Sequence, residues 1–272
     1  MKNNTLILGR GYIGTRLQEE LNCEISDKKI YSYKDIEAEL KRFKPKTIIN
    51  CIGNVGRNVD ECEIDLDKTL IANSFVPVIL AEAALRNNIK LVHMSTGCIY
   101  HYDYSKDMPI DENKEPDFFE LFYSRAKIYS ERALALLPKK YPVLIIRIRV
   151  PLDDRPHHRN ILTKLIAYKK VIDIPNSVTY IPDFLKALKH LISTDASGIY
   201  NVANSGGLTY PELLTVYKKY VPDFEYEVVD YKKLNIVRTN LILSTKKLEN
   251  AGFKVRHINE VLQECVENYL KY

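Results

Sequence analysis

The sequence predicts an α/β fold in which a parallel, doubly wound sheet is followed by a smaller C-terminal lobe. Three observations support this prediction. A short apolar run, Thr5–Leu8, leads into a glycine turn over residues 9–14 and then a helical pattern to about Leu21. Strand-like and helix-like segments alternate afterwards. A strand ending in Ser95-Thr96 precedes the pair Tyr123-x-x-x-Lys127. Together these features are typical of a Rossmann-type sheet.

The glycine turn has the spacing Gly-x-Gly-x-x-Gly between a strand and a helix. Its first glycine permits the tight turn, its second lets the backbone approach a pyrophosphate, and its third allows close helix–strand packing. The following helix N-terminus offers unpaired N–H groups to phosphate. We therefore predict a dinucleotide site formed by Gly9, Arg10, Gly11, Tyr12, Ile13 and Gly14, with the loop Asn50, Cys51, Ile52 and Gly53.

The remaining elements follow from hydrophobic periodicity. Strands are predicted at Thr5–Leu8, Cys23–Asp27, Lys46–Asn50, Lys90–Ser95, Val143–Val150 and Gly198–Ala203, and helices after Gly11 to about Leu21, at Asp35–Phe43, Asp67–Asn87 and Tyr123–Leu136. We expect residues 1–150 to bind NAD(P), completed by the strand near 198–204, and residues 151–272 to form mainly a substrate-binding lobe. His93 lies inside a predicted strand and is interpreted as a core residue.

Composition narrows the class of protein. The net charge of +5 comes from scattered Lys and Arg, so nucleic-acid binding is not expected, whereas an anionic nucleotide-linked substrate suits this balance. The five cysteines, Cys23, Cys51, Cys62, Cys98 and Cys265, are odd in number and lack metal-ligand spacing, which favours a reducing cytoplasm without disulfides or a metal. No signal peptide and no membrane span are expected.

Tyr123 and Lys127 lie one turn apart on the same helix face. The ammonium is expected to lower the pKa of the phenol, so that its hydroxyl transfers a proton near neutral pH. An upstream hydroxyl, Thr96 or Ser95, would hold the substrate oxygen. In this context the pair predicts a nicotinamide-dependent oxidoreductase.

The chain resembles the extended short-chain dehydrogenase/reductases, within them the dTDP-4-dehydrorhamnose reductase branch, and most closely the bifunctional UDP-4-keto-6-deoxyglucose 3,5-epimerase/4-reductases. The resemblance extends from Lys46 to Lys247. It rests on the stretches Gly56–Glu63, Thr96–Tyr100, Tyr123–Lys127, Arg147–Pro151, Arg159–Lys164 and Ile174–Ser177.

The resemblance implies epimerisation of a nucleotide-linked 4-keto-6-deoxyhexose at C3 and C5, then reduction of C4 by NADPH to give UDP-L-rhamnose. It implies that Tyr123 protonates the C4 oxygen, that Lys127 holds the nicotinamide ribose and that Thr96 binds the substrate oxygen. Cys98 and Lys164 would transfer the protons of epimerisation. Asn160 is a candidate sugar contact or an ordinary loop residue, and Arg238 a phosphate contact or a surface ion-pair residue.

Two features depart from the family pattern. Leu8 stands where the first glycine of the family turn would be, and Gly9 supplies the shorter form. Asp27 favours NADH, whereas Lys28 and Lys29 favour the 2′-phosphate of NADPH, so the choice stays open.

Four alternatives concern function and assembly. A monofunctional dTDP- or UDP-4-keto-rhamnose reductase would not need Cys98 or Lys164. A GDP-fucose-type epimerase/reductase would use a histidine, and His157 and His158 lie in the relevant loop. A non-catalytic dinucleotide-binding subunit is disfavoured because the hydroxyl, Tyr and Lys are all present. The sequence also leaves a homodimer open, because several tyrosines are expected to be exposed and could serve an interface, namely Tyr102, Tyr104, Tyr129 and Tyr217.

Overall fold

A six-stranded sheet organises the first of two units in the computed structural model, which describes residues 3–56 and 58–272. This first unit takes its described residues from Met1–Ile99, Pro116–Arg147 and Leu188–Tyr200. The second unit comprises Tyr100–Glu115, Ile148–Ala187 and Asn201–Tyr272. Arg57, within one stretch that supports the family resemblance, lies outside the described residues.

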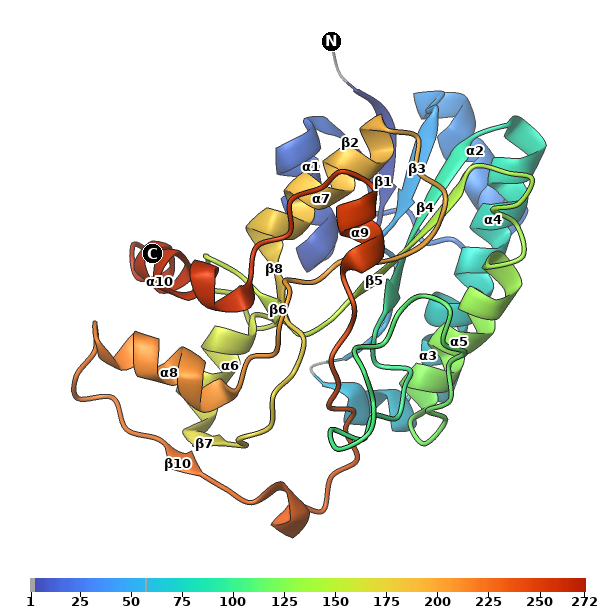
Figure 1. Ribbon diagram of the computed structural model, residues 1–272. Helices are drawn as coiled ribbons and strands as arrows, with labels where there is room; N and C mark the ends of the chain where they lie inside the picture. Colours follow the sequence, from blue (N-terminus) through green and yellow to red (C-terminus); the bar gives the residue numbers. More distant parts are fainter. Residues whose placement is uncertain (1–2, 57) are drawn as a thin grey trace. The chain divides into compact units, whose positions relative to one another are not determined.

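The strands of the main sheet run in the order β2-β1-β3-β4-β5-β9 (Figure 1). Their bounds are β1 Asn3–Leu8, β2 Cys23–Ser26, β3 Thr47–Asn50, β4 Lys90–Thr96, β5 Val143–Ile148 and β9 Gly198–Asn201. β1 pairs in parallel with β2 and β3, and β3 with β4, so that Leu8, Asn50 and His93 share one level. The carboxyl ends of these strands therefore meet at one edge, where parallel sheets bind ligands.

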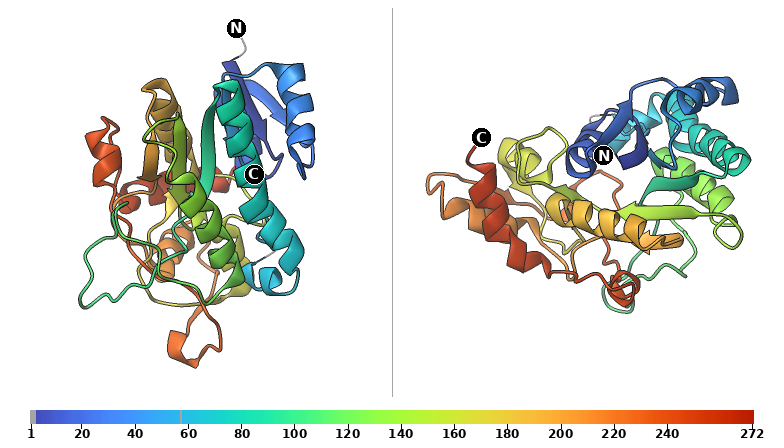
Figure 2. Two further views of the ribbon diagram at one scale, coloured as in Figure 1. Left: turned by 90° about the vertical axis from the view of Figure 1, so that its right-hand side faces the viewer. Right: turned by 90° about the horizontal axis from the view of Figure 1, so that it is seen from above.

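The helices of this unit lie on both faces of the sheet (Figures 1 and 2). They are α1 Tyr12–Leu21, α2 Tyr33–Phe43, η1 Val59–Glu63, α3 Leu66–Leu70, η2 Ile71–Phe75, α4 Val76–Asn87, α5 Phe122–Leu134 and the second half of α7 Ile181–Ser193. Alternate strand residues such as Leu6, Leu8 and Ile48 are fully buried and pack with α2 and α4 in one apolar cluster. On the other face, Glu20 of α1 pairs with Lys189 of α7 at 3.4 Å.

The helix from Leu66 to Asn87 contains a π-helical turn, Ile71–Phe75, which ends two residues before Pro77. Proline has no N–H to donate and its ring collides with the carbonyl four residues back, so the wider turn accommodates it without breaking the helix. Among the described residues this is the one helix long and apolar enough to span a membrane by length and composition. Half of its most apolar window is buried, as in a core helix.

Several predicted boundaries were wrong by one or two residues at their ends. β2 and β9 end at Ser26 and Asn201 instead of Asp27 and Ala203, and α5 ends at Leu134 instead of Leu136. β5 ends at Ile148 because Val150 adopts φ +34°, which turns the chain out of the strand. The following residues, Pro151–Leu152 (β6), instead pair with Thr179–Tyr180 (β8).

The second unit has its own apolar core, built from helices and short strands. These are α6 Ile161–Tyr168, β7 Lys170–Val171, α8 Tyr210–Lys218, β10 Glu227–Val228, η3 Tyr231–Lys233, α9 Lys246–Asn250 and α10 Ile258–Tyr269. Leu162, Leu213 and Val261 are among its fully buried side chains. The unit also takes in residues 100–115, which the sequence does not assign to the lobe. The division into a cofactor-binding and a substrate-binding part stays a prediction.

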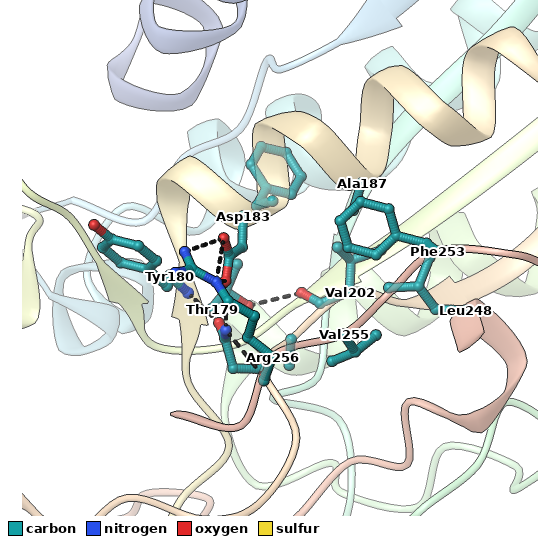
Figure 3. A pocket seen from close by; sticks show the side chains of 12 residues that line it. Thr179, Tyr180, Asp183, Ala187, Val202, Leu248, Phe253, Val255 and Arg256 are labelled. Carbon is teal, nitrogen blue, oxygen red and sulfur yellow. Dashed lines mark hydrogen bonds and ion pairs between the residues drawn. The ribbon is translucent and has the colours of Figure 1, made fainter. Parts of the chain in front are cut away.

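Arg256 anchors the start of α7 in this unit through an ion pair with Asp183 (Figure 3). Arg256 Nη2 contacts Asp183 Oδ1 at 2.5 Å, and Arg256 Nη1 contacts Glu264 Oε2 at 2.8 Å. The cavity beside it has a volume of about 10 Å³, which holds one water molecule at most. This cavity is therefore a packing feature and too small for a sugar nucleotide.

Candidate active site

The glycine turn after β1 has the geometry of a phosphate cradle. Gly9 adopts φ +101°, and a Cβ there would lie 2.8 Å from Ile52 N. A Cβ on Gly14 would lie 2.1 Å from Gly9 O, whereas one on Gly11 would have no atom within 4 Å. Gly11 is also the N-cap of α1, without a side-chain cap. The turn thus leaves its backbone and the helix N–H groups open to an anion.

The loop after β3 is tied to β4 by a buried amide–imidazole pair. Asn50 Oδ1 accepts from Ile52 N at 3.0 Å, so Asn50 Nδ2 faces His93 Nδ1 at 3.0 Å. An amide nitrogen only donates, and therefore Nδ1 accepts and the neutral ring carries its proton on Nε2. Burial, and then the charge of Lys127, lower the pKa of His93 well below its usual value. The prediction of a core histidine is confirmed by its complete burial.

The end of β4 presents Thr96 and Cys98. Thr96 Oγ1 accepts from Cys98 N at 3.1 Å, which leaves the hydroxyl proton of Thr96 available for another oxygen. Ser124 Oγ donates to Cys98 O at 2.6 Å and joins this segment to α5. Ser95, the other candidate hydroxyl, instead donates to buried Glu131 at 2.6 Å. The structure therefore favours Thr96 as the hydroxyl that meets the substrate.

Helix α5 carries Tyr123 and Lys127 on one side. Lys127 is 5% exposed, and its Nζ donates to Met94 O on β4 at 3.0 Å. Burial lowers the pKa of Lys127 to about 8, and the largest opposing effect is the charge of Glu131. A Cβ on Gly53 would lie 3.7 Å from Lys127 Nζ, so the lysine borders the Asn50–Gly53 loop. The structure thus brings the predicted cofactor residues of this unit to one sheet edge.

Two tertiary contacts of the first unit were not predicted. Phe122 N, in the first turn of α5, donates to Glu63 Oε1 at 2.5 Å, so a carboxylate from η1 caps the helix that bears Tyr123. Asn73, in the π-helical turn, exchanges hydrogen bonds with the backbone of Asn54 at 2.7 and 3.1 Å. The roles of Glu63 and Asn73 could not be read from local patterns, because each side chain acts on a segment distant along the chain.

Glu131 lies one turn beyond Lys127 and forms a buried ion pair with Arg147 of β5. Arg147 Nε lies 3.0 Å from Glu131 Oε1, and both side chains are at most 3% exposed. The spacing Tyr123-x-x-x-Lys127-x-x-x-Glu131 could have pointed to this glutamate, because all three residues share one helix face.

In the second unit, Lys164 lies on the first turns of α6, and Asn160 is the N-cap of that helix. The Asn160 side chain is fully buried, accepts from Leu162 N at 3.1 Å and donates to Asp153 O at 2.8 Å. These contacts fix the start of α6 and so position Lys164. A contact between Asn160 and the sugar stays a prediction. Burial, followed by the charges of Arg159 and Arg238, lowers the pKa of Lys164.

The segment that carries Arg238 is held by buried Arg149. Arg149 donates to Thr239 Oγ1 at 2.7 Å and to Asn176 Oδ1 at 2.8 Å. Arg238 itself is half-buried, and its backbone N–H donates to Tyr231 at 3.2 Å. Arg149 lies in a stretch that supports the family resemblance, but its role as the anchor of this segment was not predicted.

The two histidines of the α6 loop form a ring pair with centroids 4.2 Å apart. His157 Nδ1 accepts from Arg159 N at 3.1 Å, and burial lowers the pKa of His157. His157 therefore shapes the loop backbone. Among the described residues, no three His, Cys, Asp or Glu side chains form a cluster that could hold a metal ion.

The glycine turn, the aligned strand ends and the Tyr–Lys helix define a class, the NAD(P)-dependent short-chain dehydrogenase/reductases with a Rossmann-type fold. Within that class, residues 4–271 match the family described as RmlD substrate binding domain, and the chain belongs to this family. A bifunctional dTDP-4-dehydrorhamnose 3,5-epimerase/reductase from Arabidopsis thaliana is 30% identical over 97% of this chain and 92% of its own length.

A trifunctional UDP-glucose 4,6-dehydratase/3,5-epimerase/reductase of the same plant is 31% identical over 96% of the chain, which spans only 41% of that relative. Among solved structures, UDP-rhamnose synthase from Acanthamoeba polyphaga mimivirus matches with a TM-score of 0.90 at 24% identity, covering 97% of this chain and 99% of that one. This likeness confirms the predicted fold class.

Proposed function

We propose that the protein epimerises a nucleotide-linked 4-keto-6-deoxyhexose, UDP-4-keto-6-deoxyglucose, at C3 and C5 and then reduces C4 to give UDP-L-rhamnose. The observation that carries the proposal is the joining of Thr96 and Cys98 to the Tyr123–Lys127 helix through Ser124. Relatives similar over nearly the whole chain are named for both activities.

The cofactor of the proposal is NADPH, and the residues present fit it. The open side of Gly11 and the uncapped start of α1 would hold the pyrophosphate. Arg10 Nη2 donates to Ile25 O of β2 at 3.4 Å, and Ile25 precedes the exposed Lys28 and Lys29 by three and four residues. These cations support the binding of a 2′-phosphate. When bound, the nicotinamide supplies the hydride that reduces C4.

In the reduction step, the Tyr123 hydroxyl gives its proton to the C4 oxygen while the Thr96 hydroxyl donates a hydrogen bond to the same oxygen. The Lys127 ammonium holds the nicotinamide ribose, fixed by its bond to Met94 O. The C4 carbonyl becomes a hydroxyl, with carbon receiving hydride and oxygen receiving the proton.

In the epimerisation step, a base removes the hydrogen of C3 or C5, and the neighbouring C4 ketone stabilises the carbanion as an enolate. An acid on the opposite face returns a proton and inverts the carbon. We assign these roles jointly to Cys98 and Lys164. The lowered pKa of Lys164 supports the assignment, because a lysine that loses its proton more readily exchanges protons nearer neutral pH.

The test is a product assay by NMR with UDP-4-keto-6-deoxyglucose and NADPH, run on the wild type and on Cys98→Ala. We expect UDP-L-rhamnose from the wild type and no inversion at C3 and C5 from the variant. Reduction without inversion by the wild type would establish a monofunctional reductase instead. Cys62→Ala is the matched control, since Cys62 is buried within η1 and has no assigned role in proton transfer.

A GDP-fucose-type reaction is the second candidate, and the observation that keeps it is the His157–His158 pair. Turnover of the corresponding GDP-linked sugar, lost in His158→Asn, would favour it. The use of His157 Nδ1 in the loop backbone favours the rhamnose reaction.

We further propose a cytoplasmic enzyme that acts without nucleic acid or membrane. Homodimer formation is supported by apolar side chains exposed along α3–α4 and α5, namely Leu66, Phe75, Val78 and Tyr129. Exposed apolar side chains favour self-association. Tyr217, which the sequence analysis counted among the exposed tyrosines, is buried and gives no support to a dimer.

A further inference from the structure

The buried Glu131–Arg147 pair has no part in the reaction as proposed. It nevertheless joins α5, the helix that bears Tyr123 and Lys127, to strand β5. Glu131 is 2% and Arg147 1% exposed. Glu131 Oε2 accepts from Ser95 Oγ of β4 at 2.6 Å, and Glu131 Oε1 accepts from Arg147 Nε of β5 at 3.0 Å. One carboxylate therefore fastens α5 to two neighbouring strands.

Lys127 lies one turn from this carboxylate in a setting that disfavours its charge. Its Nζ is buried against Met94 O and the Gly53 loop. Of the groups that favour its ammonium, Glu131 has the largest effect, ahead of Cys51 and Cys62. Burial raises the pKa of Cys51 to about 12, so that thiol is uncharged at neutral pH. Cys62 is likewise a fully buried thiol.

The remaining titratable group near Lys127 on β4 is His93. Burial and the charge of Lys127 keep its ring neutral, its Nδ1 accepts from the Asn50 amide, and it adds no negative charge. Tyr123 lies one turn before Lys127 on the same helix. Among these neighbours, Glu131 thus supplies the negative charge at neutral pH that compensates the buried ammonium.

We propose that Glu131, held by Ser95 and Arg147, is a positioning residue that fixes α5 against β4 and β5 and keeps the Lys127 ammonium protonated for cofactor binding. The inference rests on the proposed function, since it takes Lys127 as the residue that holds the nicotinamide ribose. A carboxylate that only anchored the helix would have no effect on the charge of Lys127.

The test is NADPH affinity as a function of pH, measured by fluorescence titration of the full chain from pH 6 to 10. In the wild type, affinity falls as pH rises through the pKa of Lys127, which is about 8 in the free protein. Glu131→Gln removes the compensating charge, and the midpoint of the fall moves down by about one pH unit. Arg147→Met leaves the Glu131 charge unopposed, and the midpoint moves up.

Opposite shifts are the signature of the proposal. Midpoints that stay in place or move together, with affinity reduced equally at every pH, would overturn it. Glu63→Gln is the matched control, because Glu63 anchors the same helix at its N-terminus and is expected to leave the midpoint unmoved.

Removing one partner of a buried ion pair can unfold a protein, so the variant Glu131→Gln/Arg147→Met is included, in which both charges are removed together. Its midpoint is expected below that of the wild type, and an unchanged midpoint contradicts the proposal. A wild type that binds neither NADPH nor NADH at pH 6 would refute the proposed function itself, which separates the two failures.

Discussion

Lys127 and Lys164 are both lysines whose pKa is lowered chiefly by burial, but their surroundings differ. Lys127 is buried on α5 beside a carboxylate that opposes the loss of its proton. Lys164 is half-buried on α6, and the next influences after burial are two cations, Arg159 and Arg238, which promote that loss. The charges that act after burial thus favour the ammonium at Lys127 and oppose it at Lys164.

This difference indicates how one chain can assign binding and proton transfer to the same residue type. A lysine that holds a ribose must stay charged, whereas a lysine that inverts a carbon must change its charge during the reaction. The neighbouring charges, rather than the residue type, separate the two roles.

Exchanging each lysine for methionine is expected to give the largest effects. Lys127→Met should lower C4 reduction about 10³-fold and keep most deuterium uptake at C3 and C5 in D₂O. Lys164→Met should lower that deuterium uptake about 10²-fold and keep reduction of an already inverted 4-keto sugar within about tenfold. Both rates are read by NMR. A variant that loses both activities equally would break the comparison.

Asn160→Ala is expected to have an intermediate effect, because it removes the buried cap that positions Lys164. The free energy of unfolding should fall by about 2 kcal/mol, measured by urea denaturation, with deuterium uptake reduced alongside. Asn58→Ala provides the comparison: Asn58 caps η1 through Asp60 N on the surface, and its loss should cost less than about 1 kcal/mol. Equal losses of unfolding free energy in the two variants would argue against Asn160 as the buried cap that positions Lys164.

Arg159→Gln should produce the smallest effect. Removing a cation beside Lys164 stabilises its ammonium and raises its pKa, so the limb of the deuterium-uptake profile that belongs to Lys164 moves to higher pH by less than about one unit. The shift should shrink in high salt, because Lys164 is only half-buried. A shift to lower pH would mean that Arg159 does not act through its charge.

The sequence is sufficient for the sheet and the reacting helix because their signals are local. The glycine turn and the Tyr–Lys spacing each fit within a few residues, and the strands are continuous apolar runs. Boundaries failed where the backbone departs from standard geometry, as at Val150 with φ +34°. A positive φ at a β-branched residue has no sequence signature.

The supporting residues could not be predicted for a different reason. Glu63, Asn73 and Arg149 act on segments far along the chain, so their roles depend on tertiary contacts. Residues 100–115 join the second unit through contacts such as the hydrogen bond from Ile110 N to Ile242 O at 2.8 Å. No sequence pattern in either segment predicts this contact.

The π-helical turn before Pro77 gives the long helix a particular tolerance to deletion. Such a turn holds one residue more than an α-helical turn, so deleting a residue within Ile71–Phe75 restores regular winding and keeps both flanks on their original faces. A deletion elsewhere rotates the rest of the helix by about 100° and turns its apolar face off the sheet. In evolution, a gap inside this turn would therefore preserve the scaffold while releasing the Asn73–Asn54 contact.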